Sequence, residues 1–269
     1  MPPSRPHIRV IAAAAFAALW LIAGDAAARS RGAPPPTPVK SGLAVSIVDG
    51  DTLVLKGGVE VRLVGIQAPK LPLGRRSFKA WPLAPEAKAV LSRLTLGKQL
   101  ALWYGGRKSD RHGRLLAHLT TPEGKWVQGE LLGAGMARVY SFPDNRARVD
   151  EMLALERAAR DGRRGIWAHR YYRILTPDSL ALHIGTFQIV EARVLAVALV
   201  RGRAYLNFGP DWRTDFTVSI ARGKLRRGWR GADPGKLYKG KRLRVRGWLK
   251  SFNGPMIEAT HPEQIELLP

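Results

Sequence analysis

The chain has 269 residues, of which 45% are hydrophobic, and its 44 Lys plus Arg against 21 Asp plus Glu give a formal net charge of +23. This composition allows a buried core and excludes a disordered polyelectrolyte, a collagen-like fibre and a multispan membrane protein. The lack of cysteine excludes disulfides, cysteine zinc sites, iron–sulfur clusters and thiol nucleophiles. So strong a positive charge attracts polyanions such as nucleic acids, anionic lipid head groups or acidic glycans.

The N-terminal segment has the pattern of an export signal. Two arginines precede an apolar run over residues 10–24, which is shorter than the ~20 residues of a bilayer-spanning helix. Three alanines ending at residue 28 form a small-residue cleavage pattern. We expect a signal peptide over residues 1–28, export to the periplasm or secretion, and no stable membrane span after cleavage. An uncleaved anchor is the alternative, and the Pro-rich residues 29–42 predict a leader outside the fold.

The first folded region is expected over residues 43–168. Its first 24 residues alternate apolar and polar side chains and are interrupted at Asp49-Gly50 and Gly57-Gly58, which predicts a meander of three short strands. The pattern then predicts a helix at 85–94, strands at 99–104 and 115–120, and a helix at 127–134. A third helix is expected to run to about Arg160, with Asp144 or Asn145 as its N-cap. Five strands and three helices in this order indicate an α+β domain, a five-stranded OB-type barrel with helices packed on it.

A second, mainly β domain is expected over residues 185–269, after a connector at 169–184. Strand patterns at 187–200, 204–208, 215–221, 242–249 and 256–259, separated by glycines, predict another five-stranded, OB-like barrel. Between residues 201 and 250, 15 Lys and Arg stand against three Asp and are interleaved with aromatic residues. This mixture is typical of proteins that bind single-stranded nucleic acid, although aromatic residues also fill barrel cores.

One basic strand of the second domain alternates strictly. Leu243 and Val245 should face inward, and Arg242, Arg244 and Arg246 outward. We expect these arginines and the neighbouring Trp248 to contact nucleic acid.

Three short motifs of the first domain occur in a fixed order. They are Asp-Gly-Asp-Thr at 49–52, Arg-Leu-Val-Gly-Ile-Gln-Ala-Pro-Lys at 62–70 and Ser-Asp-Arg-His-Gly-Arg at 109–114, and a Gly-Ile-Trp follows at 165–167. Each motif alone is weak. Together they resemble the staphylococcal nuclease (thermonuclease) family over roughly residues 43–167.

The resemblance implies a Ca²⁺-dependent phosphodiesterase on an OB-type barrel. In that family two carboxylates hold the metal, a Glu helps to activate water, and two arginines grip the phosphate. A hard cation and guanidinium groups both stabilise the negative charge of a pentacoordinate phosphate. Arg62 and Arg114 match the two arginines, and Asp51 matches the first metal carboxylate.

This sequence departs from the family at two acidic positions. Gln67 replaces the second metal carboxylate and Lys70 replaces the Glu base. A Gln offers Ca²⁺ a neutral oxygen only, and a charged Lys cannot accept a proton. Since a lost base costs ~10²–10⁴-fold in rate, we expect weak or absent Ca²⁺ binding and doubtful catalysis. Lys70 is then expected to add a third cation to the phosphate pocket.

Further residues have expected roles at this site. Asp49 is a turn residue that could join a rebuilt metal shell, and His112 is a loop histidine that could act as a base. Asp110 is expected to orient the Arg114 loop. Tyr140 and Phe142 lie two residues apart on an extended segment, so both can face and stack on a base.

The leading hypothesis is an exported nucleic-acid-binding protein of the thermonuclease fold, with Arg62 and Arg114 holding the phosphodiesters of DNA or RNA, most simply single-stranded. One alternative is an active metal-dependent endonuclease whose shell is rebuilt around Asp51, Asp49 and Gln67. Another is a non-enzymatic binder of envelope polyanions. No protein partner is expected.

Overall fold

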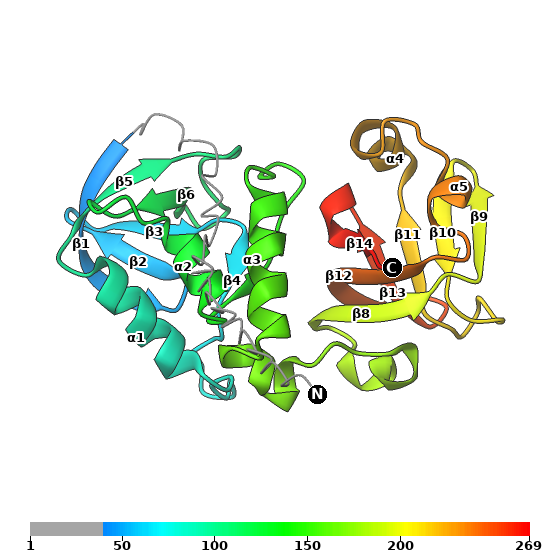
Figure 1. Ribbon diagram of the computed structural model, residues 1–269, viewed down its shortest axis with the longest axis horizontal. Coiled ribbons are helices and arrows are strands. Elements are labelled where there is room, and N and C mark those ends of the chain that lie inside the picture. The colour runs from blue at the N-terminus through cyan, green and yellow to red at the C-terminus, as the bar shows by residue number, and fades with distance from the viewer. Residues whose placement is uncertain (1–39) are drawn as a thin grey trace, which may run out of the picture. The chain divides into compact units, whose positions relative to one another are not determined.

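The computed structural model describes residues 40–269, so the predicted signal peptide and most of the leader lie outside the described residues. Five strands form a closed barrel in the order β1-β2-β3-β6-β5 (Figure 1). Their bounds are β1 Lys40–Asp49, β2 Thr52–Leu55, β3 Val59–Leu63, β5 Gln99–Trp103 and β6 Leu115–Thr120. Two short strands, β4 (Ile66–Gln67) and β7 (Arg138–Val139), pair with each other beside it. The barrel confirms the predicted fold, with β1 beginning three residues before the expected start.

The predicted helices pack against this barrel as α1 (Ala84–Thr95), α2 (Val127–Gly133) and α3 (Val149–Asp161). Helix α3 begins three or four residues later than expected, because neither Asp144 nor Asn145 is its N-cap. The backbone of Asp144 accepts a hydrogen bond from Arg107 N, and Asn145 Nδ2 donates to Arg107 O. These residues therefore fix a neighbouring loop instead of capping the helix. A Cβ at Gly106 would lie 1.9 Å from Asp144 O, so only glycine allows this approach.

The second mainly β domain is also confirmed, with seven strands where five were expected. Their bounds are β8 Phe187–Arg193, β9 Ala196–Val200, β10 Arg203–Asn207, β11 Thr217–Ile220, β12 Arg242–Ser251, β13 Pro255–Ala259 and β14 Ile265–Leu267. Two short helices that the pattern did not predict, α4 (Arg222–Gly228) and α5 (Pro234–Tyr238), lie between β11 and β12. Short 3₁₀ helices occur at Gly165–Ala168, Arg170–Tyr172, Pro177–His183 and Pro262–Gln264. The expected strand at 187–200 is interrupted at Val194 and Leu195.

This interruption hides a repeat of the first barrel's topology. Strand β8 pairs with β12 while β9, two residues further on, pairs with β10, so β8 and β9 together take the place of β1. From there β10, β11, β13 and β12 follow the order of β2, β3, β6 and β5. Every pairing has the same sense in both domains, including the parallel pairs β3/β6 and β11/β13. The two domains share this topology without an evident sequence repeat.

A buried ion network joins the two domains. Arg246 of β12 is 1% exposed, and its guanidinium contacts Glu156 of α3 at 2.9 and 3.0 Å and Glu266 of β14 at 2.5 Å. Burial lowers the pKa of Arg246, but the two carboxylates outweigh burial and raise it above its usual value. Ser141 Oγ and His261 Nε2 form a second link at 2.7 Å. Arg246 faces out of its own barrel as predicted, but that face is covered by the first domain.

Within residues 40–269, no helix combines the length and apolar character that crossing a membrane requires.

Candidate functional site

The turn between β1 and β2 places two carboxylates below the barrel surface. Asp49 Oδ1 accepts a hydrogen bond from Asp51 N at 3.0 Å, which closes the turn. Asp51 is fully buried, and its Oδ2 accepts from Ala68 N at 2.7 Å. The Asp-Gly-Asp motif therefore fastens the first hairpin to the segment that follows β4.

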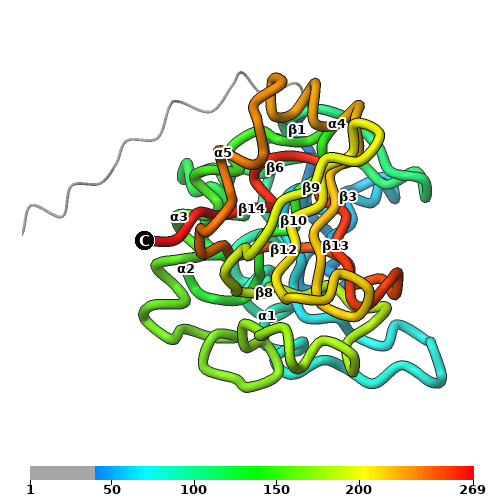
Figure 2. The backbone as a smooth tube through the Cα atoms, turned by 90° about the vertical axis from the view of Figure 1, so that its right-hand side faces the viewer, coloured from blue at the N-terminus to red at the C-terminus, as the bar shows by residue number. Residues whose placement is uncertain are grey.

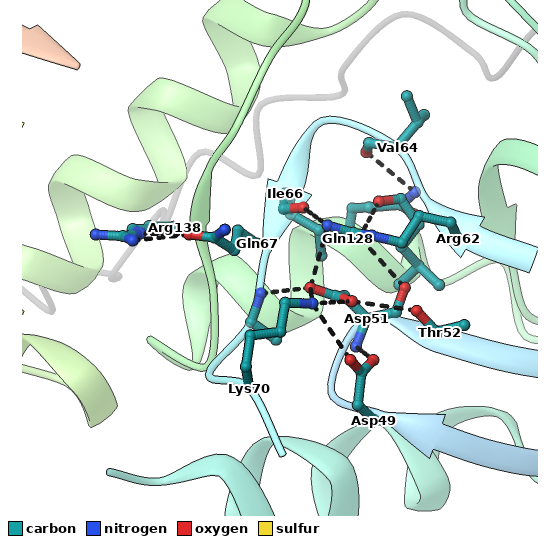
Figure 3. A network of polar contacts seen from close by, with 12 residues as sticks. Asp49, Asp51, Thr52, Arg62, Val64, Ile66, Gln67, Lys70, Gln128 and Arg138 are labelled. Carbon is teal, nitrogen blue, oxygen red and sulfur yellow. Dashed lines mark hydrogen bonds and ion pairs between the residues drawn. The ribbon is translucent and has the colours of Figure 1, made fainter. Parts of the chain in front are cut away.

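Lys70 points between these two carboxylates (Figure 3). Its Nζ lies 2.7 Å from both carboxylate oxygens of Asp51 and 3.2 Å from Asp49 Oδ2. Burial raises the pKa of Asp51, but Arg62 and Lys70 outweigh burial and hold it well below its usual value. Burial and the charge of Asp51 raise the pKa of Asp49. Lys70 therefore neutralises the acidic pair, and its expected role as a third cation in the phosphate pocket is wrong.

Gln67 is bound by an arginine. Strands β4 and β7 pair it directly with Arg138, whose Nε and Nη2 donate to Gln67 Oε1 at 3.0 and 2.7 Å. Burial lowers the pKa of Arg138 to about 10, so this residue stays charged at neutral pH. The single acceptor oxygen of Gln67 is thus taken by a cation.

These contacts leave no donor set that fits Ca²⁺. A calcium ion takes six to eight oxygen ligands, whereas here an ammonium group lies between the carboxylates and the amide oxygen is already bound. Among residues 40–269, no group of three or more His, Cys, Asp or Glu side chains is placed to hold a metal ion. The rebuilt shell of Asp51, Asp49 and Gln67 is therefore not formed in this arrangement.

Arg62 lies where the acidic pair meets an open pocket. Its Nη1 and Nη2 donate to the carbonyl oxygens of Leu63 and Ile66 at 2.7 Å each, and Nη2 lies 3.2 Å from Asp51 Oδ2. These contacts orient the guanidinium rigidly. Both Nη atoms of Arg62 are thus bound within the protein, and among residues 40–269 only its Nε lacks an acceptor. Arg62 therefore has fewer free N–H donors for a ligand than an unpaired arginine.

The pocket beside Arg62 has a volume of about 520 Å³ and is strongly basic. Arg114 lines it as predicted and is held by Asp110, which accepts from Arg114 Nε at 2.8 Å. Burial raises the pKa of Asp110, but hydrogen bonds from Arg114 and neighbouring backbone groups outweigh burial and lower it. Arg107 and Arg111 also line the pocket. Neither residue was among those expected at the site, although both lie within seven residues of Arg114.

His112 also lines this pocket, but its Nε2 accepts a hydrogen bond from Arg111 Nε at 3.1 Å. Because that lone pair is used, the imidazole does not present a free base in this arrangement.

Three predicted aromatic residues come together at the pocket wall. Tyr140, Phe142 and Trp248 all line the cavity, and Trp248 Nε1 donates to Tyr140 Oη at 2.9 Å. The rings of Tyr140 and Phe142 meet edge to face with centroids 4.8 Å apart. The second domain thus contributes one wall residue to a pocket of the first.

The remaining arginines of β12 have structural partners. Arg242 and Arg244 both donate to Glu191 of β8, at 2.5 and 2.8 Å, and Arg246 belongs to the buried network between the domains. The structure thus gives Arg246 a structural role, because a side chain that is 1% exposed cannot reach a ligand.

Comparison with known proteins agrees with the barrel and the motifs. The family model of staphylococcal nuclease homologues matches residues 60–169. An uncharacterized endonuclease of Escherichia coli O157:H7 is 30% identical over 131 residues, which cover 47% of this chain and 76% of that protein. Protein ParB of Escherichia coli is 32% identical over 175 residues, covering 61% of this chain and 87% of ParB. Endonuclease YhcR of Bacillus subtilis is 30% identical over 136 residues, covering 47% of this chain but 11% of YhcR. By its motifs, its barrel and these matches, the chain belongs to the staphylococcal nuclease family.

Proposed function

We propose that this protein binds single-stranded nucleic acid in the basic pocket of its first barrel and does not hydrolyse it by the Ca²⁺-dependent route of its family. The family supports a nucleic-acid ligand and generally depends on Ca²⁺. The export pattern of residues 1–28 leads us to propose that binding takes place outside the cytoplasm.

The position of Lys70 is the observation that carries this proposal. The carboxylates of Asp49 and Asp51 face two cations, Lys70 and Arg62, so the negative charge of the pair is already neutralised. Such a group has little attraction for a divalent cation, which would have to displace an ammonium that contacts three carboxylate oxygens.

The pocket retains the features needed to hold a phosphodiester. Four arginines line it against Asp110 and Asp144, and Asp110 is already paired with Arg114. Guanidinium groups recognise phosphate oxygens by paired hydrogen bonds. The wall of Tyr140, Phe142 and Trp248 offers ring faces and edges to the adjoining bases.

Relatives that are named endonucleases favour a second candidate, an active nuclease. Asp144 is the observation that keeps this candidate testable, because it lines the pocket and forms no ion pair within residues 40–269. A carboxylate in that position can act as a base. If the chain cleaves nucleic acid, Asp144→Asn should abolish the cleavage.

Binding and cleavage should be measured on the full chain with labelled single-stranded oligothymidylate. We expect binding that weakens steeply with salt, is unchanged by chelator and yields no product with added Ca²⁺. Arg114→Ala should lower the affinity and reduce the salt slope by about 1. The exposed Arg93 of α1 provides the matched control, Arg93→Ala. Efficient Ca²⁺-dependent cleavage would refute the proposal, and equal affinity for heparin would favour a binder of envelope polyanions.

A double substitution tests the cause of the proposed inactivity. Gln67→Asp with Lys70→Glu restores both acidic groups of the family pattern. We expect this variant to bind Ca²⁺ by calorimetry and to gain Ca²⁺-dependent cleavage. A variant that binds Ca²⁺ but stays inactive would show that some other feature prevents hydrolysis.

A further inference from the structure

The outer face of the second barrel contains a groove that the proposed function does not use. On β10, Ala204 and Leu206 are buried in the core, whereas Tyr205 and Asn207 face outward. A cavity of about 440 Å³ opens above these outward residues. Its lining comprises Ala198, Val200, Tyr205, Asn207, Trp212, Thr217, Phe252, Asn253 and Met256. In Figure 2 this barrel faces the viewer, with β9, β10 and β13 labelled.

Strand residues form the base of the groove, and two aromatic loop residues lie beside it. Ala198, Thr217 and Met256 belong to the paired strands β9, β11 and β13, whereas Trp212 and Phe252 lie in the loops after β10 and β12. Trp212 is 49% exposed and Phe252 is 58% exposed. Large aromatic side chains so open to solvent around one cavity indicate a binding surface.

The groove lies on the strand pair that matches the site of the first barrel. The basic pocket uses the outward side of the parallel pair β3/β6, where Arg62 is opposite Leu116. The groove uses the outward side of β11/β13, where Thr217 is opposite Met256. Both sites therefore lie on the outward side of the corresponding parallel strand pair. The pocket lies near the end of β3, and the groove lies near the start of β11.

The rim of the groove is mainly cationic. Arg201, Arg203, Arg213 and Lys250 neighbour its lining residues in sequence or along a strand. Two acids pair with three of them: Glu258 lies 3.6 Å from Arg203 and 3.1 Å from Lys250, and Asp211 lies 4.0 Å from Arg213. Four cations against two acids leave the rim with net positive charge. The Arg213 guanidinium lies 4.5 Å from the centre of the Trp212 ring. Phosphates therefore find positive charge beside aromatic surface, and Asn207 and Asn253 add amide groups that can hydrogen-bond to base edges.

We propose that this groove is a second binding site for single-stranded nucleic acid, with bases stacked on Trp212 and Phe252 and phosphates along the cationic rim. The proposal shares the ligand class of the proposed function but concerns a different site. A base platform bordered by cations is the arrangement that binds single strands with little dependence on sequence.

The test uses the full chain and two labelled probes of equal length, an oligothymidylate and its abasic counterpart. Stacking contributes about 1–3 kcal/mol per base, so Trp212→Ala should weaken oligothymidylate binding roughly 5- to 150-fold, with a similar loss for Phe252→Ala. Binding of the abasic probe should be unchanged. Tyr171 is also 49% exposed, and Tyr171→Ala is the matched control.

The outcomes separate this inference from the proposed function. If Arg114→Ala weakens binding but Trp212→Ala and Phe252→Ala do not, the groove proposal is wrong and the pocket proposal stands. The reverse result supports the groove and refutes the pocket. Equal losses for the abasic probe or for heparin would show that the groove attracts polyanions without stacking bases, which also overturns the inference.

Discussion

The two barrels share one strand order but carry different residues on corresponding elements. The hairpin between β1 and β2 carries Asp51, whereas the hairpin between β9 and β10 carries Arg201 and Gly202. The outward side of the parallel strand pair presents Arg62 in the first barrel and Thr217 in the second. The topology thus selects the usable face, while turns and loops decide whether that face holds phosphate by charge or offers an aromatic surface.

The largest effect on stability is expected from removing Arg246, the centre of the ion network between the two barrels. Arg246→Ala removes the main partner of Glu156, which is fully buried. We expect the free energy of unfolding in urea to fall by about 3–5 kcal/mol, because a buried carboxylate loses its two closest charged contacts and keeps Arg160 at 3.2 Å. Arg242→Ala, at a side chain that is 56% exposed, should cost about 1 kcal/mol or less. Equal losses for the two variants would contradict the importance of burial here.

Lys70→Ala tests the acidic hairpin, which only the first barrel has. The variant leaves Asp49 and Asp51 with Arg62 alone, so we expect a loss of about 2–4 kcal/mol in urea unfolding. Added Ca²⁺ should then raise the melting temperature of the variant but not of the unmodified chain. Lys79→Ala removes an exposed lysine and serves as control. Equal stabilisation of both chains by Ca²⁺ would show that the ammonium does not occupy the cation position.

Acidification should weaken the contact between the barrels. Burial lowers the pKa of His261 to about 4, and nearby cations add to this effect while Glu263 opposes it. The unfolded chain binds this proton near pH 6.5, so His261 destabilises the fold as pH falls from about 6.5 to 4, by about 2 kcal/mol at pH 5.

Urea unfolding at pH 7 and pH 5 measures this dependence. His261→Gln should reduce the difference between the two values, whereas His112→Gln, at an exposed loop, should not. An unchanged pH dependence in His261→Gln would show that other groups cause the effect. His118 is one such group, because burial and the charge of Arg148 lower its pKa to about 3.

The smallest effect is expected at Trp248, the residue of the second barrel that lines the pocket of the first. Trp248→Ala should weaken oligothymidylate binding by about 1 kcal/mol, or roughly fivefold, because one stacking wall is lost. Trp248→Phe should recover most of the affinity if the ring stacks. Unchanged affinity in Trp248→Ala would remove Trp248 from the site.

The first barrel was predictable because its signals are local. Paired glycines mark the hairpins, side chains alternate along the strands, and the three motifs place Arg62 and Arg114 on the pocket. The direction of Lys70 was not predictable in this way, since sequence identifies a cation without saying which charges it meets in the fold.

The second barrel was less predictable because its interface is not local. Alternation placed Arg246 on the correct side of β12, but nothing nearby showed that α3 covers that side. One signal was present. Glu156 occupies a position on the apolar stripe of α3 that begins at Val149 and Met152, and a carboxylate there requires a buried partner.

The link between Glu156 and Arg246 spans 90 residues of chain. At about 5–20 residues per second, the ribosome delivers the arginine roughly 5–18 s after the glutamate. During that interval Glu156 has Arg160 of the same helix, 3.2 Å away in the folded protein, as its counterion, and lacks the paired contacts that Arg246 supplies. A polypeptide cut between the two domains would therefore expose Glu156 to solvent with Arg160 as its remaining ion-pair partner among the described residues.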